Sequence, residues 1–122
     1  MASGVIDRME TTFELLWTNP SPLASAGFSA QTVSLDLSTY DAVFIVFIAN
    51  LNYDRMATAI CPKKSGYNVL TTAIPSATAV RARNATVTDN GVQFSSGYSG
   101  TSASETSAIP YRIYGIRGLA LS

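Results

Sequence analysis

Histidine is absent from this 122-residue sequence, and cysteine occurs once. Histidine is the usual general base and the commonest metal ligand, and a Ser-His-Asp triad cannot be built without it. A single cysteine excludes an intrachain disulfide and a multi-cysteine zinc site. Because Cys61 lies between Ile60 and Pro62, we expect it to be a small apolar core residue rather than a nucleophile.

Charge is also scarce. Charged residues make up 13% of the chain and hydrophobic residues 47%, and eight acidic side chains balance eight basic ones. Binding to nucleic acid or to an anionic membrane requires a basic excess, so neither partner is expected. With so few charges, either Ser, Thr and Asn solvate the surface, or part of it is buried against other chains.

Targeting signals are missing as well. No apolar run reaches 18 residues, so no membrane-spanning helix is expected. The first 12 residues, MASGVIDRMETT, contain no apolar core of a signal peptide. We therefore expect synthesis and assembly in a cytoplasm.

The carboxylates do not suggest catalysis. A glycosidase needs two of them across a cleft, whereas Asp36 and Asp41 flank a turn, where Asp usually caps the backbone. Asp89 belongs to a hairpin turn, and Glu105 to a loop rich in Ser and Thr. The sequence thus predicts no enzyme activity, no catalytic residue, no metal and no cofactor.

Segments typical of strands follow one another along the chain, separated by Gly, Pro, Asn and Asp. Asp-Asn-Gly at 89–91 is a strong hairpin signal. The pattern predicts an all-β fold, an antiparallel β-sandwich of jelly-roll type with about eight strands. Residues 1–12 are expected to be a linker or attachment segment, and residues 13–122 the sandwich domain. The expected strands are 13–18, 32–37, 42–49, 56–61, 67–74, 77–88, 92–98 and 109–117.

Two of these segments carry large side chains on both faces. Residues 42–49, AVFIVFIA, are apolar at odd and even positions alike, and 109–118, IPYRIYGIRG, place Arg and Tyr opposite Ile. Because interfaces are enriched in Tyr and Arg, we expect subunit contacts and a homo-oligomer. The expected contact residues are Phe44, Val46, Arg112, Tyr114 and Ile116.

Exposed tyrosines in polar loops are candidates for binding a host surface or a glycan. One cluster contains Tyr53 with Asn52 and Asp54, and another contains Tyr98. Tyr67, beside an asparagine, is a third. Each could equally be a turn residue whose ring lies on the surface.

Two basic residues alternate with apolar ones in the expected strand 77–88. We expect Arg81 and Arg83 to line its solvent face or to pair with acids across a subunit boundary.

Three stretches resemble a known group of proteins. They are WTNPSP at 17–22, QTVSLDLSTYD at 31–41 and IPYRIYGIR at 109–117. Together they resemble small tail-fibre, baseplate or minor virion proteins of tailed bacteriophages and prophages of Gram-positive gut bacteria. The resemblance covers both ends of the chain, and residues 55–105 match only in general character.

The resemblance implies a β-sandwich, often trimeric, that is exposed on a virion assembled in the bacterial cytoplasm. The expected function is that of a virion structural protein, a tail-fibre or receptor-binding module that acts by multivalent surface binding. Its partners would be its own copies, other virion proteins and a host cell-surface glycan. Two alternatives stay open: a capsid-decoration or head-fibre protein, and a stand-alone carbohydrate-binding module.

Overall fold

The computed structural model describes residues 11–64, 68–73 and 80–119. These residues form nine strands and one short 3₁₀-helix. The strands are β1 (Thr12–Thr18), β2 (Gln31–Ser34), β3 (Ala42–Asn50), β4 (Met56–Pro62), β5 (Asn68–Ala73), β6 (Val80–Thr88), β7 (Gly91–Ser99), β8 (Ser102–Ala103) and β9 (Ser107–Arg117), and the helix η1 is Tyr53–Arg55. No helix in the described ranges is long and apolar enough to cross a membrane.

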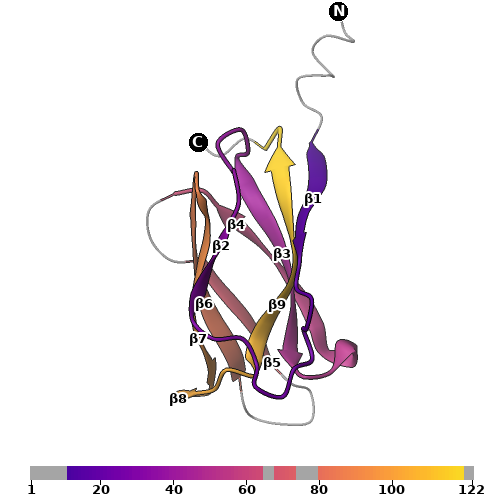
Figure 1. Cartoon of the computed structure of the whole chain (residues 1–122), viewed down its shortest axis with the longest axis vertical. Helices are drawn as coiled ribbons and strands as arrows, with labels where there is room; N and C mark the ends of the chain where they lie inside the picture. Colours follow the sequence, from indigo (N-terminus) through magenta and orange to yellow (C-terminus); the bar gives the residue numbers. More distant parts are fainter. Residues whose placement is uncertain (1–10, 65–67, 74–79, 120–122) are drawn as a thin grey trace, which may run out of the picture.

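The strands form two antiparallel sheets that pack face to face (Figure 1). Sheet A has the order β1-β9-β3-β4, and sheet B the order β2-β7-β6-β5 with β8 added beside β7. The predicted all-β sandwich is therefore confirmed. The first strand starts at Thr12, next to the expected boundary, whereas the proposed linker up to residue 10 lies outside the described residues.

The topology combines nested and local pairings. Strands distant in sequence pair in both sheets, β1 and β3 with β9 and β2 with β7. By contrast, β3–β4 and β5–β6–β7 pair with their neighbours in sequence. The hairpin between β6 and β7 turns at Asp89–Asn90, as the sequence predicts. Strand β2 is shorter than expected, because Leu35 and Leu37 bond instead to the carbonyls of Asn90 and Asp89.

The core follows from strand alternation. In β3, Val43, Ile45 and Phe47 point between the sheets and are fully buried, while Phe44 and Val46 point outward and are only partly covered. Cys61 is buried in the same core, and burial raises the pKa of its thiol to about 12. Its expected core position is therefore confirmed.

Arg83 corrects a prediction from the sequence. Its strand alternates as expected, but the arginine face of β6 points into the sandwich, and Arg83 is fully buried. The guanidinium donates to the carbonyls of Phe28, Ser95, Glu105, Ser107 and Ala108 at 2.7 to 3.2 Å. Burial lowers its pKa to about 10, and the Glu105 carboxylate acts in the opposite direction. A guanidinium has five N–H donors, so each donor of Arg83 bonds to a carbonyl of its own chain. Arg83 therefore needs no acidic partner from another subunit.

Arg81 lies on the same side of β6 as Arg83, so it too does not line the solvent face as predicted. It is partly buried and donates to the Ser107 hydroxyl at 3.2 Å. Both arginines therefore donate hydrogen bonds to the first residues of β9.

Candidate functional site

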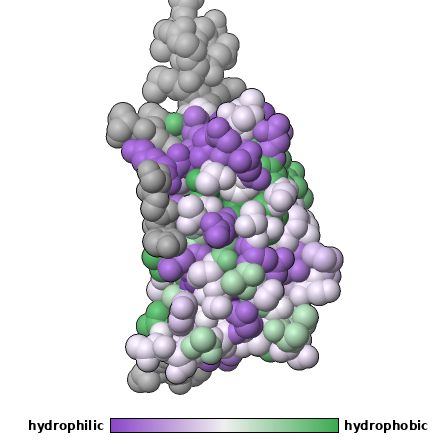
Figure 2. Space-filling model, turned by 60° about the vertical axis from the view of Figure 1, so that its left-hand side comes forward, coloured by the Kyte–Doolittle hydropathy of each residue, from purple (hydrophilic) through white to green (hydrophobic). Residues whose placement is uncertain are grey.

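The two outer faces of the sandwich differ sharply in chemistry. The outer face of sheet B consists of side chains that alternate with buried ones such as Val33, Leu70 and Phe94. Its residues are Thr32, Ser34, Val69, Thr71, Val80, Ala82, Asn84, Thr86, Thr88, Gln93 and Tyr98. None of these eleven is charged, and most carry a hydroxyl or an amide. Figure 2 turns this side toward the reader and shows hydrophilic and near-neutral residues with only scattered hydrophobic ones.

The outer face of sheet A is apolar. It is defined by Phe13, Leu15, Thr18, Ala42, Phe44, Val46, Met56, Thr58, Ile60, Arg112, Tyr114 and Ile116, which face away from the core on all four strands. Cross-strand register places four of them in one row, Leu15–Tyr114–Phe44–Ile60. Large side chains therefore span the whole width of the sheet, and Arg112 is the single charge among the twelve.

The rim of this face is open to solvent. Leu15 is 52% exposed and Ile60 51%, although both are large and aliphatic. Phe44 connects the row, with its ring centroid 5.4 Å from that of Phe13 and 6.0 Å from that of Tyr114, both edge-on. Edge-to-face contacts are the favoured aromatic geometry, so the surface is already ordered in one chain.

The structure brings the five predicted contact residues together. Register pairs Phe44 with Tyr114 and Val46 with Arg112, and it pairs Ile116 with Ala42 at the end of the same face. Ile116 is fully buried, however. It therefore offers no surface to a partner in the single chain.

Four large residues of the outer face of sheet A were not among the predicted contacts. They lie on the edge strands β1 and β4 and are Phe13, Leu15, Met56 and Ile60. A signal is present in FELL at 13–16, where the apolar Phe13 and Leu15 share one parity. Their exposure depends on the position of β1 at an edge, which a sequence does not give.

The Tyr53 cluster adjoins the outer face of sheet A. The centroid of the Tyr53 ring lies 5.6 Å from that of Tyr111. The Arg112 guanidinium lies over the Tyr111 ring, 4.7 Å from its centroid. Asn52 caps η1, with its side-chain oxygen accepting from the Asp54 amide at 2.9 Å. Tyr53 itself lies in this 3₁₀ turn and is 47% exposed.

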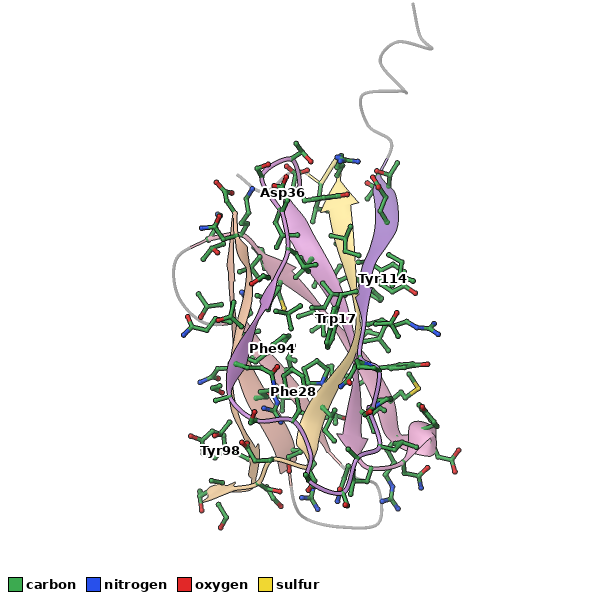
Figure 3. All side chains as sticks on the ribbon, in the orientation of Figure 1. Trp17, Phe28, Asp36, Phe94, Tyr98 and Tyr114 are labelled. Atoms are coloured by element: carbon green, nitrogen blue, oxygen red, sulfur yellow. The ribbon has the colours of Figure 1, made fainter. Side chains whose placement is uncertain are left out.

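Tyr98 lies apart from that cluster. Figure 3 shows it at the lower left, on sheet B, whereas Tyr114 is at the opposite side of the molecule on sheet A. The two predicted surface clusters therefore do not form one site. Tyr67, the third candidate, lies outside the described residues.

Tyr98 reaches its face because of a β-bulge. Val92 and Phe94 are buried, so simple alternation would also turn residue 98 inward. The register of β7 against β6 shifts between Phe94 and Gly97, and Gly97 takes the inward position instead. Tyr98 is then outward and 38% exposed. Bulges commonly re-aim a side chain in this way.

Buried polar contacts hold the bulge. The Ser95 carbonyl accepts from Arg83 at 2.7 Å, and the Ser95 hydroxyl accepts from the Asn84 amide at 3.0 Å. A Cβ at Gly97 would come within 2.9 Å of the Arg83 guanidinium and 2.4 Å of the Ser107 carbonyl oxygen. Glycine is therefore required at position 97, where the backbone of β7 packs against the Arg83 side chain.

The carboxylates serve turns and ion pairs. Asp36 accepts from the Ser38 hydroxyl at 2.7 Å and from its amide at 3.1 Å, and these bonds lower its pKa. Asp89 pairs with Lys63 at 2.7 Å, and Asp41 accepts from the Leu119 amide at 3.1 Å. The predicted capping role of Asp36 is confirmed.

The part of the chain that the structure describes has no metal-binding cluster. No three Cys, Asp or Glu side chains gather there. One shallow depression is lined by Ser38, Thr39, Tyr40, Asp41, Lys63, Lys64 and Leu119. Lys63 is already engaged there by Asp89 and by the Leu37 carbonyl, 2.9 Å from its Nζ.

Comparisons of the chain with protein-family models, curated proteins and solved structures found no match. The candidate surfaces therefore rest on geometry and composition alone.

Proposed function

We propose that this protein is a bacteriophage or prophage virion module that assembles with its own copies through the outer face of sheet A. Its activity is multivalent binding to a surface, as in a tail fibre or receptor-binding apparatus. The observation that carries the assembly is the apolar row Leu15–Tyr114–Phe44–Ile60, which crosses the sheet with both ends half exposed. The virion setting is supported by the resemblance of the two ends of the chain to phage structural proteins.

The size of this face supports burial. Four strands ~4.8 Å apart and about six residues at ~3.3 Å each give a sheet plane of roughly 400 Å². The largest contiguous apolar patch on a soluble protein is commonly about 300–600 Å², and it is often functional. At about 25 cal/mol per Å², covering such a patch is strongly favourable.

Arg112, the single charged residue of the face, can form a polar contact with a neighbouring copy. The Arg112 Nε is buried and makes no hydrogen bond within the described part of the chain, while its Nη2 donates to the Tyr111 hydroxyl at 3.2 Å. Because a guanidinium has five N–H donors, an acceptor from a neighbouring copy would bond to the outer N–H groups of Arg112 rather than to the buried Nε. Three copies around one axis would also present three identical binding surfaces, which raises avidity without any new contact.

Light scattering after size exclusion tests the assembly. Wild type is expected at three times 12.9 kDa across a range of concentrations. Leu15→Ser and Ile60→Ser should shift the mass toward the monomer. Val69→Ser is the matched control, because Val69 is 55% exposed but lies on sheet B, and it should keep the wild-type mass.

Each other outcome counts against the assembly. A monomeric wild type at all concentrations would overturn it. Dissociation by Val69→Ser as readily as by Leu15→Ser would place the contact on another surface. If assembly holds, the tail and head settings are separated by co-sedimentation with host cells and with empty capsids, and the proposed function requires binding to cells.

A further inference from the structure

We propose that the outer face of sheet B is a binding surface for a neutral polysaccharide, centred on Tyr98. This rests on the proposed function in that it names the ligand class for surface binding. It uses the sheet opposite to the proposed subunit contact, so assembly leaves it free.

The charge of the face selects the ligand. Its eleven residues include no acid and no base. A polyanion such as nucleic acid or an acidic polymer needs cations to offset its repulsion, and this face has none. Polymers that carry hydroxyl groups and no charge are complementary to it.

The hydrogen-bonding groups are of the matching kind. Register aligns Thr32, Gln93 and Thr86 in one row across β2, β7 and β6. Hydroxyl and amide side chains both donate and accept, as sugar hydroxyls do. A ligand hydroxyl can therefore bond to this row in either role without burying a charge.

Tyr98 supplies an apolar contact within this polar face. Its cross-strand neighbours are Ala82 on β6 and Ala103 on β8, so the ring stands between two small side chains. Ala82 pairs in turn with Thr71 on β5. A raised aromatic ring beside low side chains fits a flat C–H face of a sugar, with polar groups within reach.

The backbone that carries the ring is also fixed in advance. The bulge that turns Tyr98 outward is held by Arg83, which is fully buried and fully hydrogen-bonded. Binding to a pre-organised surface loses less conformational entropy than binding to a mobile one. The buried arginine therefore acts as a positioning residue for Tyr98.

Affinity electrophoresis tests this surface. Wild type is run in native gels that contain dextran, laminarin, galactomannan or the anionic polygalacturonate. We expect retardation by at least one of the three neutral polysaccharides and none by polygalacturonate. Tyr98→Ala should weaken that binding about tenfold, the factor that corresponds to about 1.4 kcal/mol of lost aromatic contact, whereas Tyr98→Phe should retain it.

Tyr53→Ala is the matched control, because Tyr53 is also exposed but lies beside sheet A. It should bind as wild type does. The proposal is overturned if no neutral polysaccharide retards the wild type, if only polygalacturonate does, or if Tyr98→Ala binds unchanged.

The mass of each variant, measured separately by light scattering, distinguishes the two proposals. A monomer that still requires Tyr98 for binding would overturn the assembly alone. A trimer that binds no polysaccharide would overturn only the proposal that sheet B binds a neutral polysaccharide.

Discussion

The side-chain amide of Asn19 donates a hydrogen bond to the main-chain carbonyl of Pro110 at 2.9 Å, across 91 positions of the chain. The Asn19 backbone amide also donates to the Tyr111 carbonyl at 2.8 Å, and its side-chain oxygen accepts from Ser21 at 2.9 Å. The turn at 17–22 is thus tied to the start of IPYRIYGIRG. Two of the three stretches that carry the phage resemblance are therefore in direct contact.

Replacing Asn19 should destabilise the fold. Asn19 is 7% exposed, and a lost partner leaves a buried polar group unsatisfied at a cost of about 1–3 kcal/mol. Asn19→Ala should lower the free energy of unfolding in urea by about that amount. Asn52→Ala is the control, because its capping bond is exposed, and it should cost about 1 kcal/mol or less. Equal losses in both variants would contradict the anchoring role of Asn19.

Arg83 should be among the most sensitive positions in the chain. Arg83→Met nearly keeps the volume but leaves five carbonyls without this donor, those of Phe28, Ser107 and Ala108 in buried residues, so we expect the free energy of unfolding to fall by at least about 3 kcal/mol. Arg83→Lys restores up to three donors, so its free energy of unfolding should lie between those of wild type and Arg83→Met. Urea unfolding by tryptophan fluorescence measures both. Arg55→Met, on an exposed side chain, should be near wild type. A loss below about 1 kcal/mol in Arg83→Met would contradict the stabilising role of these five hydrogen bonds.

Local patterns predicted the strands well. Alternation and turn residues located β3 to β7 and the hairpin at 89–91, because these features depend on the nearest neighbours in sequence. The pairing of β1 with β9 was not predicted, since it joins the two ends of the chain. It is this pairing that places Phe13 and Leu15 beside Tyr114.

The inward direction of Arg83 also escaped prediction. A strand that alternates Val and Ala with Arg normally buries the apolar set. Here the carbonyls of Glu105, Ser107 and Ala108, just before and at the start of β9, accept from the arginine, and only the three-dimensional fold brings them there. The outward direction of Tyr98 depends on the same feature, because that arginine holds the bulge.

The pH dependence of stability should report the burial of Cys61. Its pKa rises from the ordinary 9.0 to about 12 because the core disfavours the thiolate. Above pH 9 the unfolded chain loses this proton and the folded chain keeps it. The stabilisation is therefore complete below pH 9 and is lost as the pH rises toward 12, by about 1.4 kcal/mol per unit.

Urea unfolding between pH 8 and 11 measures this slope for the wild type and for Cys61→Ala. The difference between the two isolates the thiol, because every other titrating group is shared. We also expect native Cys61 to resist a thiol reagent that labels the unfolded chain. Identical slopes, or rapid labelling of the native protein, would contradict the burial.

Tyr114 separates the stability of the chain from that of its assembly. Within one chain, the ring makes an edge contact with Phe44, and such a contact contributes about 0.5–1.5 kcal/mol. At the centre of an interface, a tyrosine commonly contributes about 2 kcal/mol or more. Tyr114→Ser should therefore weaken the oligomer more than it destabilises the monomer, whereas Tyr114→Phe should preserve both.

Two measurements on the same samples decide this prediction. Light scattering over a dilution series gives the dissociation constant, which Tyr114→Ser should raise about thirtyfold, the factor for about 2 kcal/mol. Urea unfolding at a concentration where every variant is monomeric gives the stability of one chain. A loss in unfolding free energy that equals the loss in assembly would mean that Tyr114 acts only through the fold, and the apolar row would then need another explanation.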